Sequence, residues 1–204
     1  GRALPFATGA KLSRPDMDVF VFSGDGDCTA IGGNHFIHAC RRNIDMTLIV
    51  INNNIYGMTG GQFSPLTPLG KKATTAPYGS IDRSFNLCDL ALGAGASFVA
   101  RGDIFHAKQL TDLIVAGYKH KGFSVIEVIA ACPISYGRRN GIPNPADMMQ
   151  YIKEHTVMKA AAEKMDPADL ADKQIIGILR EATNEPEYCE SYAALCERVQ
   201  GGAK

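Results

Sequence analysis

Short runs of β-branched and aromatic residues alternate with longer segments of helical character along most of this 204-residue chain. Residues 18–23 read DVFVFS, residues 46–51 read MTLIVI and residues 123–130 read FSVIEVIA. Apolar runs of this length are typical of buried strands. Strands separated by helix-length segments indicate βαβ units. They predict an α/β fold with a doubly wound, mostly parallel sheet covered by helices on both faces.

The same alternation predicts the remaining elements. Helices are expected over 29–42, 86–95 and 106–121, with a strand over 96–100. Beyond Cys132 the chain becomes rich in Gly, Pro and Asn, and it then predicts a helix over 145–165, a strand over 174–180 and a helix over 186–200. We therefore expect a main domain over residues 1–140 and a C-terminal α/β appendage over residues 141–204.

Composition and charge narrow the classes of partner. Lys and Arg number 21, Asp and Glu also number 21, and no basic run occurs, so we expect no binding to nucleic acid. The apolar runs are far shorter than the roughly 20 residues that span a bilayer, and no secretory leader opens the chain. We expect a cytoplasmic protein without membrane contact. Because the chain begins at Gly1 and runs directly into a helical pattern, we also expect it to be truncated at its N-terminus.

The cysteines and histidines form no recognisable metal motif. Six cysteines show no CxxC pair and no regular spacing, and stand at positions 28, 40, 88, 132, 189 and 196. Free cysteine is often a small buried hydrophobe, and we expect that role for most of them. His35 and His38 have a spacing that metal ligands use, but they lack Cys or carboxylate partners. We therefore expect both histidines to be ordinary core or surface residues rather than metal ligands.

An acidic, glycine-rich loop follows the first predicted strand. It reads Gly24, Asp25, Gly26 and Asp27 and leads into a predicted helix. Amides at a helix start attract a phosphate group, whereas a carboxylate there repels it unless a cation lies between them. Mg²⁺ prefers oxygen ligands and commonly joins one or two protein oxygens to those of a bound diphosphate. The loop therefore favours a metal-bridged diphosphate.

Three asparagines, residues 52–54, follow the second predicted strand, and 25 residues separate them from Gly26. Ligands of doubly wound sheets bind at the carboxyl ends of strands, so one βαβ unit brings Asp25 and these asparagines to the same edge. The polar stretch over 52–80 is longer than an ordinary connection, which indicates a functional loop. A GDG or an Asn run alone is a common turn, but the two at this spacing predict a shared site.

GDG followed at this distance by NN resembles the thiamine-diphosphate motif. Residues 52–68, NNNIYGMTGGQFSPLTP, and residues 33–42, GNHFIHACRR, are similar to the β subunit of 2-oxoacid:ferredoxin oxidoreductases, with the 2-oxoglutarate type nearest. The similarity covers residues 1–140 and includes the later CPISYGRRN. It implies that this region is the thiamine-diphosphate-binding domain.

The resemblance implies roles for individual residues. Mg²⁺ would be bound by side-chain oxygens of Asp25 and Asn53 and by the carbonyl of Ile55. The residues expected around the cofactor are Gly24, Gly26, Asp27, Cys28, Gly57, Met58, Thr59, Gly60 and Gln62. Met58 would lie against the reactive ring, and Arg2 matches the end of a His-Gly-Arg element near the family's active site; these two are the candidate catalytic residues. The Cys28 thiol itself is expected to pack in the core, because Mg²⁺ favours oxygen over sulfur.

The resemblance also implies further cofactors and partners. Cys132 stands where the family places one of four thiolates around a [4Fe–4S] cluster, whose other cysteines lie in an N-terminal segment absent here. The implied reaction is the coenzyme A-dependent oxidative decarboxylation of a 2-oxoacid, 2-oxoglutarate being nearest, with electrons passed to ferredoxin. In this family the α subunit supplies the carboxylate that activates the cofactor. This chain alone would therefore anchor Mg²⁺ and diphosphate without turning over substrate.

Alternatives stay open from the residues alone. A diphosphate-binding domain of a non-redox thiamine-diphosphate decarboxylase needs no cluster. A nucleotide-binding regulatory module would share the α/β fold, although the loop after residues 18–23 lacks the GxGxxG and GxxxxGK[ST] patterns. Arg138 and Arg139 are expected to be solvated, with docking of an acidic ferredoxin as the weaker hypothesis.

Overall fold

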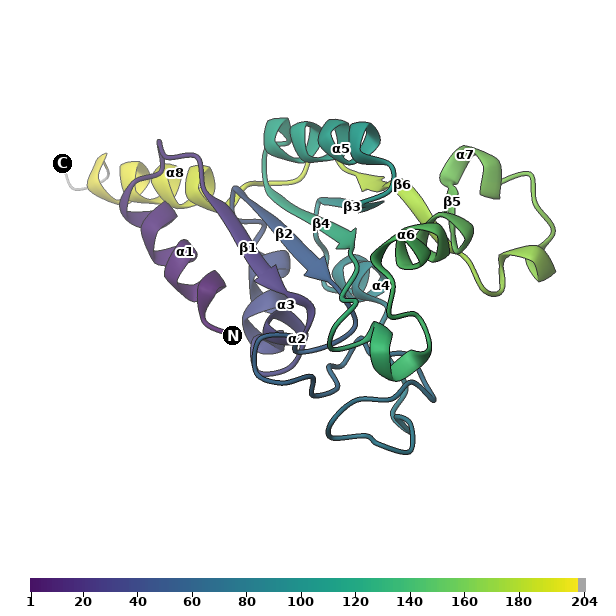
Figure 1. Cartoon of the computed structure of the whole chain (residues 1–204). Helices are drawn as coiled ribbons and strands as arrows, with labels where there is room; N and C mark the ends of the chain where they lie inside the picture. The colour runs from purple at the N-terminus through teal and green to yellow at the C-terminus, as the bar shows by residue number, and fades with distance from the viewer. Residues whose placement is uncertain (202–204) are drawn as a thin grey trace.

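Helices cover both faces of a mixed sheet in the computed structural model, which describes residues 1–201 (Figure 1). The strands are β1 (Phe20–Gly24), β2 (Met46–Asn52), β3 (Phe98–Asp103), β4 (Phe123–Ile129), β5 (Thr156–Met158) and β6 (Gln174–Glu181). Their order across the sheet is β1-β2-β4-β3-β6-β5. β1 to β4 are mutually parallel, whereas β6 pairs antiparallel with β3. The predicted mostly parallel α/β fold is confirmed.

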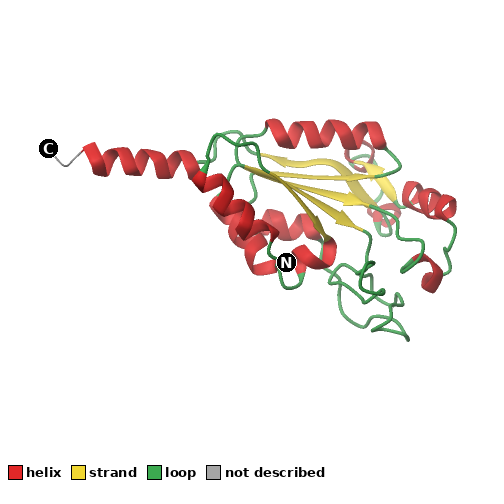
Figure 2. Cartoon of the chain, turned by 60° about the vertical axis from the view of Figure 1, so that its left-hand side comes forward, coloured by secondary structure: helices red, strands yellow, loops and turns green. Residues whose placement is uncertain are grey.

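The helices divide between the two faces of the sheet. They are α1 (Ala3–Ser13), α2 (Asp25–Thr29), α3 (Gly33–Arg42), α4 (Leu87–Gly93), α5 (Ala107–Lys119), α6 (Pro145–Glu154), α7 (Lys159–Ala162) and α8 (Tyr188–Gly201). α5 covers one face, α1, α3 and α4 cover the other, and α8 extends away from the sheet (Figure 2). Within the described residues, every helix is too short or too polar to cross a membrane.

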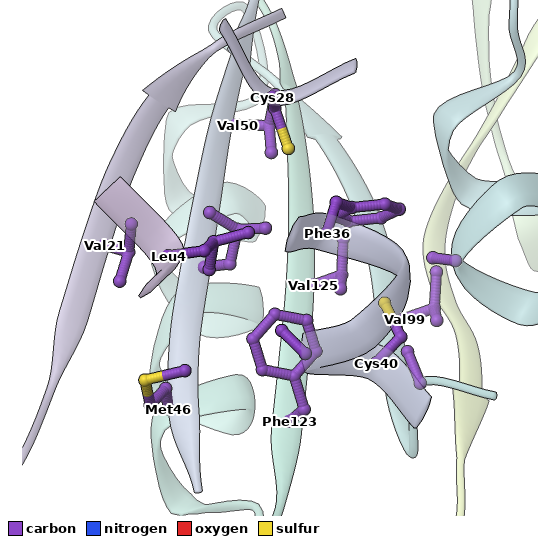
Figure 3. Packing of buried hydrophobic residues seen from close by; sticks show 14 of the residues in the cluster. Leu4, Val21, Cys28, Phe36, Cys40, Met46, Val50, Val99, Phe123 and Val125 are labelled. Atoms are coloured by element: carbon purple, nitrogen blue, oxygen red, sulfur yellow. The ribbon is translucent and has the colours of Figure 1, made fainter. Parts of the chain in front are cut away.

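The larger hydrophobic core lies between β1, β2 and β4 and the helices α1, α3 and α4. Phe36 and Cys40 of α3 face Val50, Phe123 and Val125 of the sheet, and all are fully buried or nearly so (Figure 3). Alternate side chains of each strand enter this core because successive residues of a strand point to opposite faces. Packing in this core holds β1, β2 and β4 in place, and therefore also the segments that follow these strands.

Two predicted helices differ from the structure. The helix predicted over 29–42 is interrupted between α2 and α3, where the backbone of Ala30 leaves the helical conformation (φ −84°, ψ −105°). The helix predicted over 145–165 is present as α6 and the short α7, but it is interrupted between Glu154 and Lys159. There the β-branched Thr156 and Val157 form β5 and pair with β6, so tertiary pairing overrides the helical pattern.

Part of the chain beyond residue 140 belongs to the main sheet. β6 matches the strand predicted over 174–180 and extends the main sheet beside β3. The strand predicted over 96–100 lies two residues later, as β3. The division into domains at residue 140 stays a prediction.

Candidate functional site

The candidate site lies where β1 and β2 end side by side. Gly24 is the register partner of Ile51, so Asp25, the first residue of α2, and Asn52, the last residue of β2, lie at the same edge of the sheet. In Figure 1 the arrowheads of both strands point to α2 and to the long loop that precedes α4. This loop runs without a helix or strand from residue 53 to residue 86, close to the predicted bounds. The spatial meeting expected from the strand–helix–strand spacing is therefore present.

Asp25 is a buried carboxyl group, only 2% exposed. Burial raises its pKa to about 6, although a hydrogen bond from the Ser64 hydroxyl and the backbone amides of Asp25, Gly26 and Asn53 act in the opposite direction. Among the ion pairs of residues 1–201, none involves Asp25. A buried carboxyl group that is surrounded by dipoles but lacks a cationic side chain suits a bound metal ion.

The long loop after β2 begins with a tight turn, residues 53–55, that faces Asp25. The backbone of Asn53 approaches the Asp25 carboxyl, while the Asn53 side-chain oxygen accepts the N–H of Ile55 at 3.3 Å. Asn54 has φ 62°, in the left-handed region that asparagine tolerates. Within the described part of the chain, no hydrogen bond reaches the carbonyl oxygen of Ile55. That oxygen and the remaining lone pair of the Asn53 amide are thus free to bind a cation.

Gly26 allows the two loops to touch. A Cβ at this position would overlap the ring of Tyr56, which lies directly against the glycine. Any larger residue would push the Tyr56 ring out of this position.

The segment from Tyr56 to Gln62 is a closed hairpin-like turn. The backbones of Tyr56 and Gln62 pair, and the Thr59 hydroxyl donates to the Gln62 side chain at 2.6 Å. Gly60 and Gly61 have φ 114° and 90°, so both need the freedom of glycine. Met58 at the tip is fully exposed. The turn therefore presents Met58 to whatever adjoins this face.

Cys132 lies beside this turn. Its sulfur is 3.7 Å from the position that a Cβ on Gly57 would occupy, and the Ser135 hydroxyl donates to the Gly57 carbonyl at 3.4 Å. Within residues 1–201, no group of three or more His, Cys, Asp and Glu side chains is arranged to hold a metal ion. Cys132 is therefore adjacent to the candidate diphosphate loop and belongs to no such group in the described chain. Arg138 and Arg139 are both exposed, as predicted for a solvated pair.

Other predicted residues lie at the margin of the site. Asp27 is exposed and, with Gly1, Gly24 and Phe22, lines a hollow of about 320 Å³. The Arg2 guanidinium lies 3.1 Å from the ring of His35 on α3, and His35 lines a second hollow together with Asp27. The buried Cys28 thiol points into the core near Val50, in agreement with the packing role predicted for it (Figure 3). Burial raises the pKa of Cys28 to about 12.

The sequence motifs do not identify Ser64 and Thr67 as residues of the site. The Ser64 hydroxyl donates to Asp25, its backbone N–H donates to the Thr67 hydroxyl at 2.8 Å, and that hydroxyl donates to the Asn54 carbonyl at 2.6 Å. Both side chains are 1% exposed. These bonds join the two sides of the candidate site. A Ser-x-x-Thr pattern beside prolines is a signal of hydroxyl-capped turns, but it does not reveal which carboxyl group the hydroxyl meets.

Ser64→Ala is expected to weaken Mg²⁺ binding at pH 7 by about tenfold, the scale found when a group that orients a metal ligand is lost. The substitution removes the donor that lowers the pKa of Asp25, so less of this carboxyl group is ionised. Calorimetric titration of Mg²⁺ in the presence of the diphosphate ligand measures the change. Thr75→Ala is the matched control, because Thr75 caps Phe63 of the same loop without touching Asp25. Equal affinities in both variants would remove Ser64 from the site.

Comparison with known proteins places these features in context. Residues 1–128 match the family model described as thiamine pyrophosphate enzyme, C-terminal TPP binding domain. The chain is 52% identical over 200 residues to the 2-oxoglutarate synthase subunit KorB of Methanocaldococcus jannaschii, covering 98% of this chain and 74% of that protein. It is 48% identical over 201 residues to the subunit of the same name from Methanothermobacter marburgensis, covering 98% and 70%.

A solved structure is similar over the same extent. It is the 2-oxoglutarate:ferredoxin oxidoreductase from Magnetococcus marinus with 2-oxoglutarate, coenzyme A and succinyl-CoA bound. The superposition has a TM-score of 0.84 with 31% sequence identity, and it covers 98% of this chain and 68% of the other. The similarity therefore extends beyond the loops that follow β1 and β2 to β5, β6 and α8.

Proposed function

Because this chain belongs to the thiamine pyrophosphate enzymes, among the β subunits of 2-oxoacid:ferredoxin oxidoreductases, we propose that it anchors thiamine diphosphate through Mg²⁺. The chain is accordingly a subunit of an oxidoreductase. Its proposed 2-oxoacid is 2-oxoglutarate, which is named for the relatives and is bound in the related structure. Coenzyme A, an α subunit and ferredoxin are proposed as its other partners on the same basis.

The proposed Mg²⁺ ligands are the Asp25 carboxylate, the Asn53 side-chain oxygen and the Ile55 carbonyl. The observation that carries the proposal is the buried Asp25 carboxyl group, which faces the backbone of Asn53 and has no ion-pair partner within residues 1–201. Oxygen donors of these three kinds match the preference of Mg²⁺, which also keeps positions for diphosphate oxygens and water. The residues present therefore fit the ion.

The proposed diphosphate contacts come from Gly24, Gly26, Asp27, Gly57 and Thr59, with Gly60 and Gln62 in the adjoining turn. Glycines at these points leave the backbone open to a bulky anion. Exposed Met58 is proposed to adjoin the thiazolium ring. Arg2 is proposed to act near substrate, at the outer margin of the site.

Thiamine diphosphate supplies the carbon nucleophile and the electron sink for decarboxylation of a 2-oxoacid. The proposed role of this chain is to hold and orient the cofactor. When the ion and the cofactor are bound, Asp25 would neutralise part of the charge of the ion, the Asn53–Ile55 turn would supply its other protein oxygens, and the turn with Met58 would limit movement of the cofactor. No described residue is assigned to activate the cofactor, and that role is proposed for the α subunit.

Titration of the assembled enzyme with thiamine diphosphate, NAD and ATP, each with Mg²⁺ and with a chelator, tests the proposal. We expect thiamine diphosphate to bind only with Mg²⁺ and the two nucleotides not to bind. Binding of a nucleotide in place of thiamine diphosphate would support a regulatory module and contradict the proposal.

Cys132→Ser tests whether the enzyme is of the redox type. Cys132 is proposed as one ligand of a [4Fe–4S] cluster, although the described residues alone do not provide the four ligands that such a cluster takes. After anaerobic reconstitution of the assembled enzyme we expect the variant to lose cluster iron and ferredoxin reduction, while thiamine diphosphate still binds. Cys196→Ser on α8 is the control. Wild-type iron content in Cys132→Ser would favour a non-redox decarboxylase or a cluster held elsewhere.

A further inference from the structure

Three polar side chains lie in a row across the carboxyl ends of β2, β4 and β3, on the face that otherwise carries the larger core. They are Asn52, Glu127 and Arg101, and each is at most 7% exposed. Glu127 is the register partner of Arg101 on one side and of Val50 on the other. The Arg101 guanidinium donates to Glu127 at 2.7 Å, and the Asn52 amide donates to the other carboxylate oxygen at 2.7 Å.

This row connects directly to the turn that carries the proposed metal ligands. The side-chain oxygen of Asn52 accepts the backbone N–H of Asn54 at 3.2 Å. Asn54 holds the left-handed conformation between Asn53 and Ile55. Because its amide nitrogen donates to Glu127, the Asn52 side chain cannot rotate without breaking a bond at each end. The orientation of the amide is therefore set from inside the sheet.

The far end of the row is also fixed. Arg101 donates to the Asn86 side-chain oxygen at 2.6 Å, and Asn86 caps α4 by accepting the N–H of Asp89. The Cys88 thiol of α4 approaches the same oxygen of Glu127 as Arg101, at 3.3 Å. Glu127 thus has both oxygens engaged, one toward Arg101 and α4, the other toward Asn52 and the turn. The chain of contacts runs from the start of α4 to the turn after β2.

We propose that Arg101 and Glu127 are positioning residues for the metal turn, which act through Asn52 and touch neither metal nor cofactor. The inference rests on the proposed metal-binding role of Asn53 and Ile55. Glu127 holds the Asn52 amide in the one orientation that caps the left-handed turn, and Arg101 holds the Glu127 carboxylate in place. The turn then has its metal-binding shape before Mg²⁺ arrives, so binding does not have to order it.

Stability is a poor explanation for such a pair. Apolar residues of similar volume often replace a buried ion pair without loss of stability, because removing two charges from water is costly. What apolar residues cannot supply is an acceptor for Asn52. A positioning role therefore predicts a defect in metal binding that remains when the fold is intact.

Two variants in the assembled enzyme test this inference. Glu127→Gln leaves either Asn52 or Arg101 facing an amide N–H₂ group in place of a carboxylate oxygen. Arg101→Met together with Glu127→Leu removes both charges and keeps the volume. We expect each variant to need about ten times more Mg²⁺ for half-maximal retention of thiamine diphosphate, and to regain wild-type retention at saturating Mg²⁺. We also expect amide hydrogen exchange at Asn54 to be about tenfold faster, with exchange in the centre of β4 unchanged.

Cys88→Ala is the matched control, since it removes a contact to the same carboxylate but leaves Asn52 and Arg101 paired with it. We expect its Mg²⁺ requirement and its exchange at Asn54 to equal those of the wild type. A folded double variant with the wild-type Mg²⁺ requirement and wild-type exchange at Asn54 would overturn the inference. If the wild type itself fails to retain thiamine diphosphate, the proposed function is wrong, and exchange at Asn54 alone then decides whether Glu127 holds the turn.

Discussion

Asp25→Asn is expected to weaken Mg²⁺ binding by at least about 100-fold and, in the metal-free protein at pH 7, to raise the free energy of unfolding. A lost outer-shell partner already costs about 10- to 100-fold in metal affinity, so a lost anionic ligand should cost no less. The gain in stability follows from the burial of the carboxyl group, whose pKa is raised from 3.8 to about 6. A shift of this size corresponds to about 3 kcal/mol against the ionised form, as an order of magnitude.

Asparagine keeps the shape of the side chain and an oxygen that accepts from Ser64, so the fold is expected to remain. Calorimetric titration of Mg²⁺ and denaturant unfolding of the metal-free protein measure the two effects. Asp82→Asn, which removes an exposed charge from the same long loop, is the control and should change neither. An Asp25→Asn variant that binds Mg²⁺ normally, or that is less stable than the wild type without metal, would contradict the assignment.

Lowering the pH from 7 to 4.5 is expected to weaken binding of Mg²⁺ by about 30-fold through Asp25 alone. The ion needs the carboxylate form, and with a pKa of about 6 only about one molecule in 30 carries it at pH 4.5. Parallel titration of Mg²⁺ into free thiamine diphosphate in the same buffers corrects for protonation of the cofactor. An affinity that stays constant to below pH 5 would show that Asp25 is not a ligand or is not buried as the structure has it.

The stability of the metal-free protein should change in the opposite direction. Between the unfolded pKa of 3.8 and the folded pKa of about 6, the folded state binds more protons at Asp25, so this residue's contribution to stability falls as pH rises. The penalty is complete above about pH 6 and absent below about pH 4. The difference in unfolding free energy between the wild type and Asp25→Asn isolates it from the other carboxyl groups, and this difference should shrink toward zero as the pH falls.

The parts of the fold that the sequence predicts well are those governed by local pattern. The runs at 46–51 and 123–130 match β2 and β4 closely, because a strand buried on both faces is apolar throughout. The meeting of Asp25 with Asn53 is predictable as well, since a βαβ unit returns the chain to the same edge of the sheet. Both predictions depend on contacts that one supersecondary unit determines.

The parts that the sequence does not predict depend on contacts between distant segments. Ser64 reaches Asp25 only because the long loop folds back across the strand ends, and no periodicity describes that path. Thr156 and Val157 leave the helical pattern because β6 is available as a partner. The Arg101–Glu127 ion pair is not predictable from the sequence for the same reason. The two residues lie on different strands, and their pairing can be inferred only when the strand order is known.

We propose that oxygens of Asp25, Asn53 and Ile55 bind one hard cation, which in turn binds a diphosphate. A crystal structure of the assembled enzyme with thiamine diphosphate and Mn²⁺ in place of Mg²⁺ tests it most directly, because anomalous scattering locates the manganese independently of the surrounding atoms. We expect one anomalous peak bonded to oxygens of these three residues and of the diphosphate. A manganese peak elsewhere, with the Asp25 carboxyl group still hydrogen-bonded to Ser64 and free of metal, would contradict it.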